Sequence, residues 1–170
     1  MDKEAVKNKL RGLLSKKRYE HCLDVAKTAV QLAKIHYSDP KKAETAGLLH
    51  DCAKGSKGKR LESKLLHGFA SACIAKKEFG IKDKDILNAI AHHTCGRTNM
   101  SKLEKIIYIS DHIEPGRKYR NVSKMRAAAK KDLDRAIVLV SSEMIKYLLS
   151  KDAPIFEQTL VTRNYYLKNG

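Results

Sequence analysis

The chain has 170 residues, 42% hydrophobic and 32% charged, a composition typical of one globular domain rather than a disordered chain. The formal net charge of +16 favours polyanionic partners such as nucleotides, nucleic acid or anionic lipid. We find no signal peptide, no apolar run of membrane-spanning length and no CxxC pair among the four cysteines. We therefore expect a cytoplasmic protein without membrane contact or a structural zinc finger.

Short polar residues and prolines mark where helices are expected to begin. Ser15, Asp83 and Ser123 are placed to cap helices, Asp39-Pro40 supplies a cap and a first helical residue, and Ser101-Lys102-Leu103-Glu104 matches a capping box. No convincing period-2 run interrupts this pattern, so the fold class is predicted to be all-α. In the first half of the chain we expect helices over 2–14, over 16–37, and from 40 to a mobile basic loop at 54–59. Further helices are expected from 67 to Gly80, from 84 to Gly96 and from 102 to Pro115-Gly116. After them we expect one long helix from Ser123, with Ile137, Val140, Met144, Tyr147 and Leu148 directed inward, and a last helix that starts at 152–154.

Two polar residues, His50 and Asp51, stand at the end of an otherwise apolar helical face. Ala43, Ala46, Gly47 and His50 have the i, i+3, i+4, i+7 spacing of one side of a helix. A single His-Asp pair at a helix end is more often a cap or a satisfied core pair than a set of metal ligands. Imidazole and carboxylate do suit a divalent ion such as Fe, Mn or Zn. The pair therefore predicts a metal site only if other helices supply further ligands.

Other helices carry such candidates on their apolar faces. His21 begins a stripe on its helix, and Asp111 ends the stripe of Leu103 and Ile107, where a lone carboxylate would be costly to bury without a partner or a metal. His92 and His93 lie about 100° apart around a helix, so only one of them is expected to face the site. The candidate ligands outside the pair are His21, His67, His92, His93 and Asp111.

His21, the doublet His50-Asp51 and Asp111, in this order on separate helices, resemble the signature of the HD superfamily of metal-dependent phosphohydrolases. Longer stretches are similar to the bacterial symmetrical bis(5'-nucleosyl)-tetraphosphatases. These stretches are Arg18-Tyr19-Glu20-His21, Leu48-Leu49-His50-Asp51-Cys52-Ala53-Lys54, His67-Gly68, His92-His93-Thr94-Cys95-Gly96 and Ser110-Asp111-His112-Ile113-Glu114-Pro115-Gly116-Arg117.

The resemblance implies a single HD domain over 1–170, with a core over about 16–150 and a C-terminal helix over 154–168 packed on it. It further implies symmetrical hydrolysis of diadenosine tetraphosphate to two ADP, through metal-activated water attacking phosphorus. The ligands would be His21, His50, Asp51 and Asp111. The metal would be Fe, with Mn or another divalent metal as alternatives, as one or two ions.

The resemblance also suggests which residues surround the polyphosphate. His67, His92 and Lys54 are the candidate catalytic residues, although the histidines of this region could instead bind a second metal, and both alternatives stay open. Each basic candidate has the alternative reading of a solvated surface charge. The candidate substrate-binding residues are Arg18, Lys54, His92, Arg117, Arg163 and Asn164, the last two closing over a base or ribose.

Two other functions remain as alternatives. One is an HD phosphohydrolase acting on a nucleoside triphosphate, a nucleoside monophosphate or an alarmone. The other is a basic helical module that binds nucleic acid, which the absence of a helix-turn-helix signature and the few aromatic residues argue against. The expected partner is thus a dinucleoside polyphosphate with an ADP- or GDP-type product, and a homodimer is left open.

Overall fold

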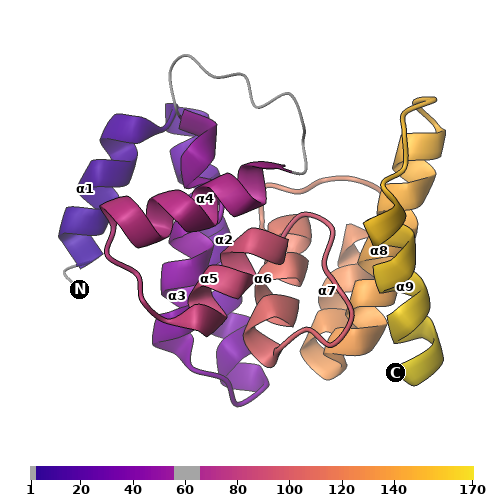
Figure 1. Ribbon diagram of the computed structural model, residues 1–170. Coiled ribbons are helices and arrows are strands. Elements are labelled where there is room, and N and C mark those ends of the chain that lie inside the picture. The colour runs from indigo at the N-terminus through magenta and orange to yellow at the C-terminus, as the bar shows by residue number, and fades with distance from the viewer. Residues whose placement is uncertain (1–2, 56–65) are drawn as a thin grey trace.

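The computed structural model describes residues 3–55 and 66–170 (Figure 1). Within these ranges the chain forms α-helices and one short 3-10 helix, without a strand, as the sequence predicts. No helix there is both long enough and apolar enough to cross a bilayer. The elements are α1 (Lys3–Leu13), α2 (Lys16–Ile35), α3 (Pro40–Leu49), η1 (Cys52–Gly55), α4 (Leu66–Glu78), α5 (Lys84–His92), α6 (Lys102–Ile113), α7 (Val122–Lys131), α8 (Leu133–Leu149) and α9 (Glu157–Asn169).

Helix α6 is the centre of the bundle. It contacts α2, α3, α5, α7 and α8, and Ile106, Ile107, Tyr108 and Ile109 are all buried on it. Four consecutive buried residues cover every side of a helix, which is the pattern of an element enclosed by others rather than of a surface helix. Figure 1 shows α8 and α9 side by side at the far end of the bundle from α1. Asp111 near the end of α6 is therefore presented inside the protein.

The predicted helix caps are confirmed at four places. Ser15 accepts from the backbone N–H of Arg18, and Asp39 and Asp83 each accept from two backbone N–H groups at the start of their helices. Ser101 and Glu104 form the predicted capping box at the start of α6. Each side chain satisfies N–H groups that have no partner in the first helical turn.

The prediction of one long helix after Ser123 is wrong. Asp132 interrupts it with an extended backbone (φ −152°, ψ 115°), and its carboxylate caps α8 by accepting from the N–H groups of Asp134 and Arg135. A carboxylate that caps from within the chain competes with helical hydrogen bonding, so the helix ends and restarts there. Ser123 lies inside α7, whose N-cap is Asn121 in the left-handed conformation.

Two further expectations about the C-terminal part are corrected. Tyr147 is 59% exposed rather than directed inward, whereas Ile137 and Val140 are buried as expected. The last helix does not start at 152–154, where Asp152 is left-handed with φ 47°, but at Glu157, after the extended N-cap Phe156. At the other end, Lys54 lies in η1 and the rest of the predicted basic loop, 56–59, falls outside the described residues.

Candidate metal centre

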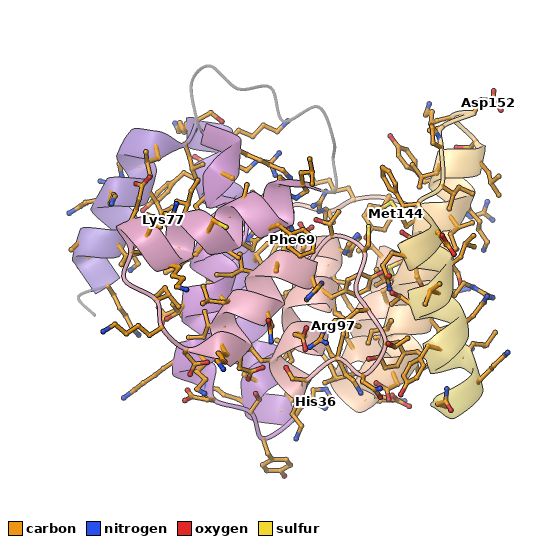
Figure 2. All side chains as sticks on the ribbon, in the orientation of Figure 1. His36, Phe69, Lys77, Arg97, Met144 and Asp152 are labelled. Carbon is orange, nitrogen blue, oxygen red and sulfur yellow. The ribbon has the colours of Figure 1, made fainter. Side chains whose placement is uncertain are left out.

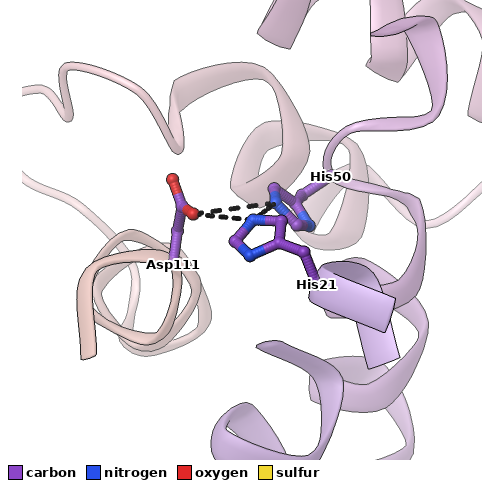
Figure 3. A group of neighbouring side chains, drawn as sticks. All are labelled: His21, His50 and Asp111. Atoms are coloured by element: carbon purple, nitrogen blue, oxygen red, sulfur yellow. Dashed lines mark hydrogen bonds and ion pairs between the residues drawn. The ribbon is translucent and has the colours of Figure 1, made fainter. Parts of the chain in front are cut away.

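Side chains from three helices meet in the interior (Figure 3). His21 from α2, His50 at the end of α3 and Asp111 from α6 bring one ligand atom each to within 4.8 Å of one another. The Nε2 atom of His21 lies 3.0 Å from Oδ1 of Asp111 and 3.3 Å from Nε2 of His50. Two imidazole nitrogens and one carboxylate oxygen directed at a common point form a donor set that suits a divalent first-row metal.

A second group of ligand atoms shares His50 with the first. His50, Asp51 and His93 also bring ligand atoms to within 4.8 Å of one another, and all three are buried. His67 adjoins this group, because its Nε2 lies 3.0 Å from Nε2 of His93. The interior therefore holds four imidazoles and two carboxylates in one continuous cluster.

Asp51 lies between the two groups and turns one oxygen toward each. Its Oδ2 is 3.5 Å from Nε2 of His50 and 3.9 Å from Nε2 of His21. Its Oδ1 is 3.4 Å from Nε2 of His67 and 3.5 Å from Nε2 of His93. This Oδ1 is buried and accepts no well-aligned hydrogen bond from the described residues, although Nζ of Lys54 is 3.0 Å away. Apart from this ion pair the oxygen has no hydrogen-bond partner among the described residues, which suits a metal ion as a further partner.

Two of the imidazoles, His50 and His93, are oriented by hydrogen bonds to the ends of their own helices. Nδ1 of His50 lies 2.7 Å from the carbonyl oxygen of Gly47, and Nδ1 of His93 lies 2.7 Å from that of Ile90. Since a carbonyl oxygen can only accept, Nδ1 carries the proton in each ring and Nε2 keeps its lone pair toward the cluster. Burial lowers the pKa of His50 to about 4, so this imidazole is neutral at pH 7.

Both carboxylates are ionised. Burial by itself raises the pKa of Asp51, but the neighbouring His50 and His93 outweigh burial and hold that pKa well below its usual range. Burial likewise opposes ionisation of Asp111, whose pKa is nevertheless held well below its usual value by the adjacent imidazole of His21, by His112 and His50, and by the charge of Arg117. A neutral His50 beside anionic Asp51 and Asp111 has the protonation states that metal binding requires.

Three basic side chains border the cluster. Nη1 of Arg18 donates to Oδ2 of Asp51 at 2.7 Å, and Nζ of Lys54 donates to the same oxygen at 3.1 Å. Nη2 of Arg117 donates to Oδ1 of Asp111 at 2.7 Å. All three side chains are about one-third exposed, so their cationic groups lie at the boundary between the cluster and solvent.

Most predicted site residues converge, but His92 does not. The structure places His93 in the cluster, whereas His92 is half-buried and lies edge-on to Phe69 at 5.4 Å between ring centroids. The 100° turn between neighbouring helical residues directs one ring inward and the other along the α4–α5 surface. His93 continues the helical spacing of Ile86, Ala89 and Ile90, which are buried on α5, and this spacing favours His93 over His92 as the residue that points inward.

Arg163 and Asn164 are also separate from the cluster. Nε of Arg163 donates to Oγ of Ser142 on α8, and Nη1 donates to Oδ1 of Asn164. Their described contacts thus belong to the packing of α9 on α8. Two residues without a predicted role also lie beside the cluster. The hydroxyl of Thr94 lies 3.1 Å from Nε2 of His67, and the carboxylate of Glu114 lies beside His21. Both were within matched stretches, but only folding brings them to the histidines.

An all-helical bundle with a buried His/Asp metal cluster defines a class of metal-binding helical hydrolases, and residues 18–116 match the model of the HD domain family. The chain belongs to the HD-domain family, in its branch of symmetrical bis(5'-nucleosyl)-tetraphosphatases. Proteins named symmetrical bis(5'-nucleosyl)-tetraphosphatase are similar along nearly the whole chain. The relative from Halalkalibacterium halodurans is 40% identical (91% of each chain), that from Staphylococcus aureus 38% (98% of this chain, 95% of the relative), and that from Bacillus subtilis 33% (100% of each).

A solved structure gives the same result for the fold. The crystal structure of an HD superfamily hydrolase from Clostridium acetobutylicum, described as involved in NAD metabolism, superposes with a TM-score of 0.91 at 40% identity, covering 100% of this chain and 99% of that one. The family and the all-α HD fold predicted from the motifs are thereby confirmed. Membership of this family implies a divalent metal, and the buried ligand cluster fits one.

Proposed function

We propose that this protein hydrolyses diadenosine tetraphosphate symmetrically to two ADP. The observation that carries the proposal is the buried cluster of imidazoles and carboxylates bordered by the cations of Arg18, Lys54 and Arg117. Phosphoryl transfer depends mainly on positioning and on neutralising charge, and this arrangement provides both. The relatives' names supply the substrate, and their similarity extends over nearly the whole chain.

The proposed metal ligands are His21, His50, Asp51 and Asp111. We propose iron as the metal, with manganese or another divalent ion as the alternative. A second ion fits beside the first, because Asp51 turns its other oxygen toward His67 and His93. When bound, a divalent ion activates water for attack at neutral pH and neutralises phosphoryl oxygens.

The basic residues have a defined task in this reaction. Arg18, Lys54 and Arg117 already donate to the cluster carboxylates, and each has part of its side chain at the solvent boundary. A tetraphosphate carries several negative charges, so these three cations are placed to bind its oxygens and to stabilise the charge on the departing ADP. Two ADP as the products require cleavage of the central anhydride, between the second and third phosphates, so the metal ligands and these cations would have to meet that bond.

His67 is the proposed residue for moving a proton. It is buried, and its Nε2 lies 3.1 Å from the hydroxyl of Thr94 and 3.4 Å from Oδ1 of Asp51. An imidazole between a hydroxyl and a carboxylate can hold a proton next to the phosphates and pass it to a leaving oxygen. Nε2 of His67 cannot both carry this proton and bind a second metal ion. The number of metal ions bound per protein therefore decides which of the two roles His67 has.

The nucleoside end of the substrate has a candidate surface outside the cluster. Phe69 projects from α4 on the face shown in Figure 2 and is 51% exposed. His92 lies edge-on to it, and the neighbouring His67 and His93 belong to the cluster. We propose that an adenine stacks on this aromatic pair while its phosphates reach the metal, since exposed rings bind bases through their faces.

The test is anaerobic turnover of diadenosine tetraphosphate by protein of defined metal content. We expect ADP as the only product, and we expect loss of bound metal and of turnover in Asp51→Asn with unchanged far-UV helicity. Asp83→Asn is the matched control, because Asp83 is a helix cap outside the cluster. AMP with ATP as products would refute symmetrical cleavage. Faster turnover of a nucleoside triphosphate, a monophosphate or an alarmone would assign another substrate.

Two further expectations accompany this proposal. All four cysteines, Cys22, Cys52, Cys73 and Cys95, are free thiols, which agrees with a cytoplasmic location. A homodimer stays a prediction, and equilibrium sedimentation of the metal-loaded protein measures it.

A further inference from the structure

We propose that Glu114 is a positioning residue that makes His21 a metal ligand; the inference rests on the metal binding proposed above. Oε1 of Glu114 lies 3.3 Å from Nδ1 of His21, and Nε2 of the same ring lies 3.0 Å from Asp111 on the opposite side. When a metal takes the place of the contact between Nε2 and Asp111, the Glu114 carboxylate accepts the hydrogen bond of the Nδ1 proton and the Nε2 lone pair stays on the metal.

His21 needs such a partner because of its place in the helix. His50 and His93 stand at helix ends and donate to the carbonyls of Gly47 and Ile90, which are among the last four of their helices and lack a helical partner. His21 lies inside α2 (Lys16–Ile35), where the carbonyls of the preceding turn already accept helical N–H groups. The contacts described for its ring come instead from other elements, from Glu114 at Nδ1 and from Asp111 and His50 at Nε2.

The turn after α6 holds the Glu114 side chain in place. Glu114 is 5% exposed, and its Oε2 accepts a hydrogen bond from the backbone N–H of Gly116. A β-carbon at Gly116 would lie 2.9 Å from Oε2, so a larger residue there would displace the carboxylate from this position. Arg126 from α7 donates to the backbone carbonyls of Ile113 and Glu114, each at 2.8 Å. The carboxylate is thus fixed before any ligand binds.

The charge of Glu114 matters as well as its position. A carboxylate is a stronger hydrogen-bond acceptor than a neutral carbonyl, so it fixes more firmly the orientation of a ring whose other nitrogen is to bind a metal. The carbonyl partners of His50 and His93 are neutral, whereas the partner of Nδ1 in His21 is a carboxylate. Loss of such partners commonly lowers metal affinity by about 10- to 100-fold.

The experiment compares the unsubstituted protein with Glu114→Gln, Glu114→Ala and the control Glu104→Gln. Glu104 is also a buried carboxylate and lies in the first turn of α6, the helix that Glu114 follows, but it pairs with Arg97 and lies outside the cluster. The dissociation constant for Co²⁺ is measured by competition with a chelating indicator, together with the visible ligand-field spectrum of the bound ion. Far-UV circular dichroism verifies that each variant is folded.

We expect Glu114→Ala to weaken Co²⁺ binding by about 10- to 100-fold and to change the ligand-field spectrum. Glu114→Gln keeps an acceptor oxygen of the same reach, so a smaller loss is expected, while Glu104→Gln should bind as tightly as the unsubstituted protein. Unchanged affinity and spectrum in both Glu114 variants would overturn the inference alone. Absence of Co²⁺ binding by the unsubstituted protein would instead overturn the proposed function, and the two failures are therefore distinguishable.

Discussion

Gly47 and Ala26 hold α3 against α2 at a distance that only glycine permits. A β-carbon at Gly47 would lie 2.7 Å from the α-carbon of Ala26. The carbonyl of Gly47 also accepts the Nδ1 proton of His50 three residues later. One residue thus sets the spacing of two helices and the orientation of a ring that meets His21 across the gap.

Gly47→Ala should therefore affect both stability and metal binding. Backbone atoms cannot move aside as a flexible side chain does, so we expect a loss of about 1–3 kcal/mol in unfolding free energy and weaker metal retention. Urea unfolding and metal analysis after gel filtration measure the two effects. Gly12→Ala is the control, because a β-carbon at Gly12 meets nothing within 4 Å on α1 and alanine favours a helix there. Equal behaviour of the two variants would refute the close-approach argument.

Arg117→Ala should weaken substrate binding without emptying the metal site. Arg117 donates to Oδ1 of Asp111 from the solvent boundary, where a phosphate can take over its hydrogen bonds. A charge-assisted hydrogen bond contributes about 1.5–3 kcal/mol, so the Michaelis constant should rise by roughly 10- to 100-fold. Lys118→Ala, which removes an exposed charge next to it, should leave the constant nearly unchanged. An unaltered Michaelis constant in Arg117→Ala would remove Arg117 from the substrate site.

Phe69→Ala should weaken binding of nucleotides but not of bare polyphosphate. Base stacking on an aromatic ring contributes about 1–3 kcal/mol, so the dissociation constant for ADP should rise by roughly 5- to 100-fold. The constant for inorganic tripolyphosphate should stay the same, since tripolyphosphate has no base. Tyr37→Ala removes another exposed aromatic ring, 93% accessible at the end of α2, and serves as the control. Equal losses for both ligands would indicate that Phe69 acts on the fold and not on the base.

The stability of the metal-free protein should depend on pH through His50. Its pKa is about 4 in the folded protein, below the value of about 6.5 expected after unfolding. Between these two pH values the unfolded chain binds more protons than the folded protein. The unfolding free energy should therefore rise by on the order of 3 kcal/mol from pH 4 to pH 6.5 and stay constant above pH 6.5 as far as His50 is concerned.

Urea unfolding in chelator between pH 4.5 and 7.5 measures this effect above the range in which Asp51 and Asp111 titrate. His50→Gln should reduce the slope of the profile, because glutamine does not titrate, while His92 and His112, whose pKa values burial also lowers, keep part of it. A profile of the same slope in that variant would show that another group causes the pH dependence.

The sequence determined the fold class and the region of the metal site. Helical periodicity placed His21, His50 and Asp111 on inward faces of separate helices, and the structure brings these three residues together. Local capping signals at Ser15 and Ser101 were also readable, since a cap depends on residues within one turn of the chain. Patterns of this kind are local, and local chemistry decides them before tertiary packing does.

Only the tertiary structure decided which side chains complete the site. It selected His93 over His92, separated Arg163 from the cluster and set Glu114 behind His21 across 93 residues of chain. It also showed that Asp132 caps a new helix where periodicity alone suggested one long helix. Spacing along a sequence gives the face of a helix, but the orientation of one helix against another depends on close approaches such as that of Gly47 to Ala26.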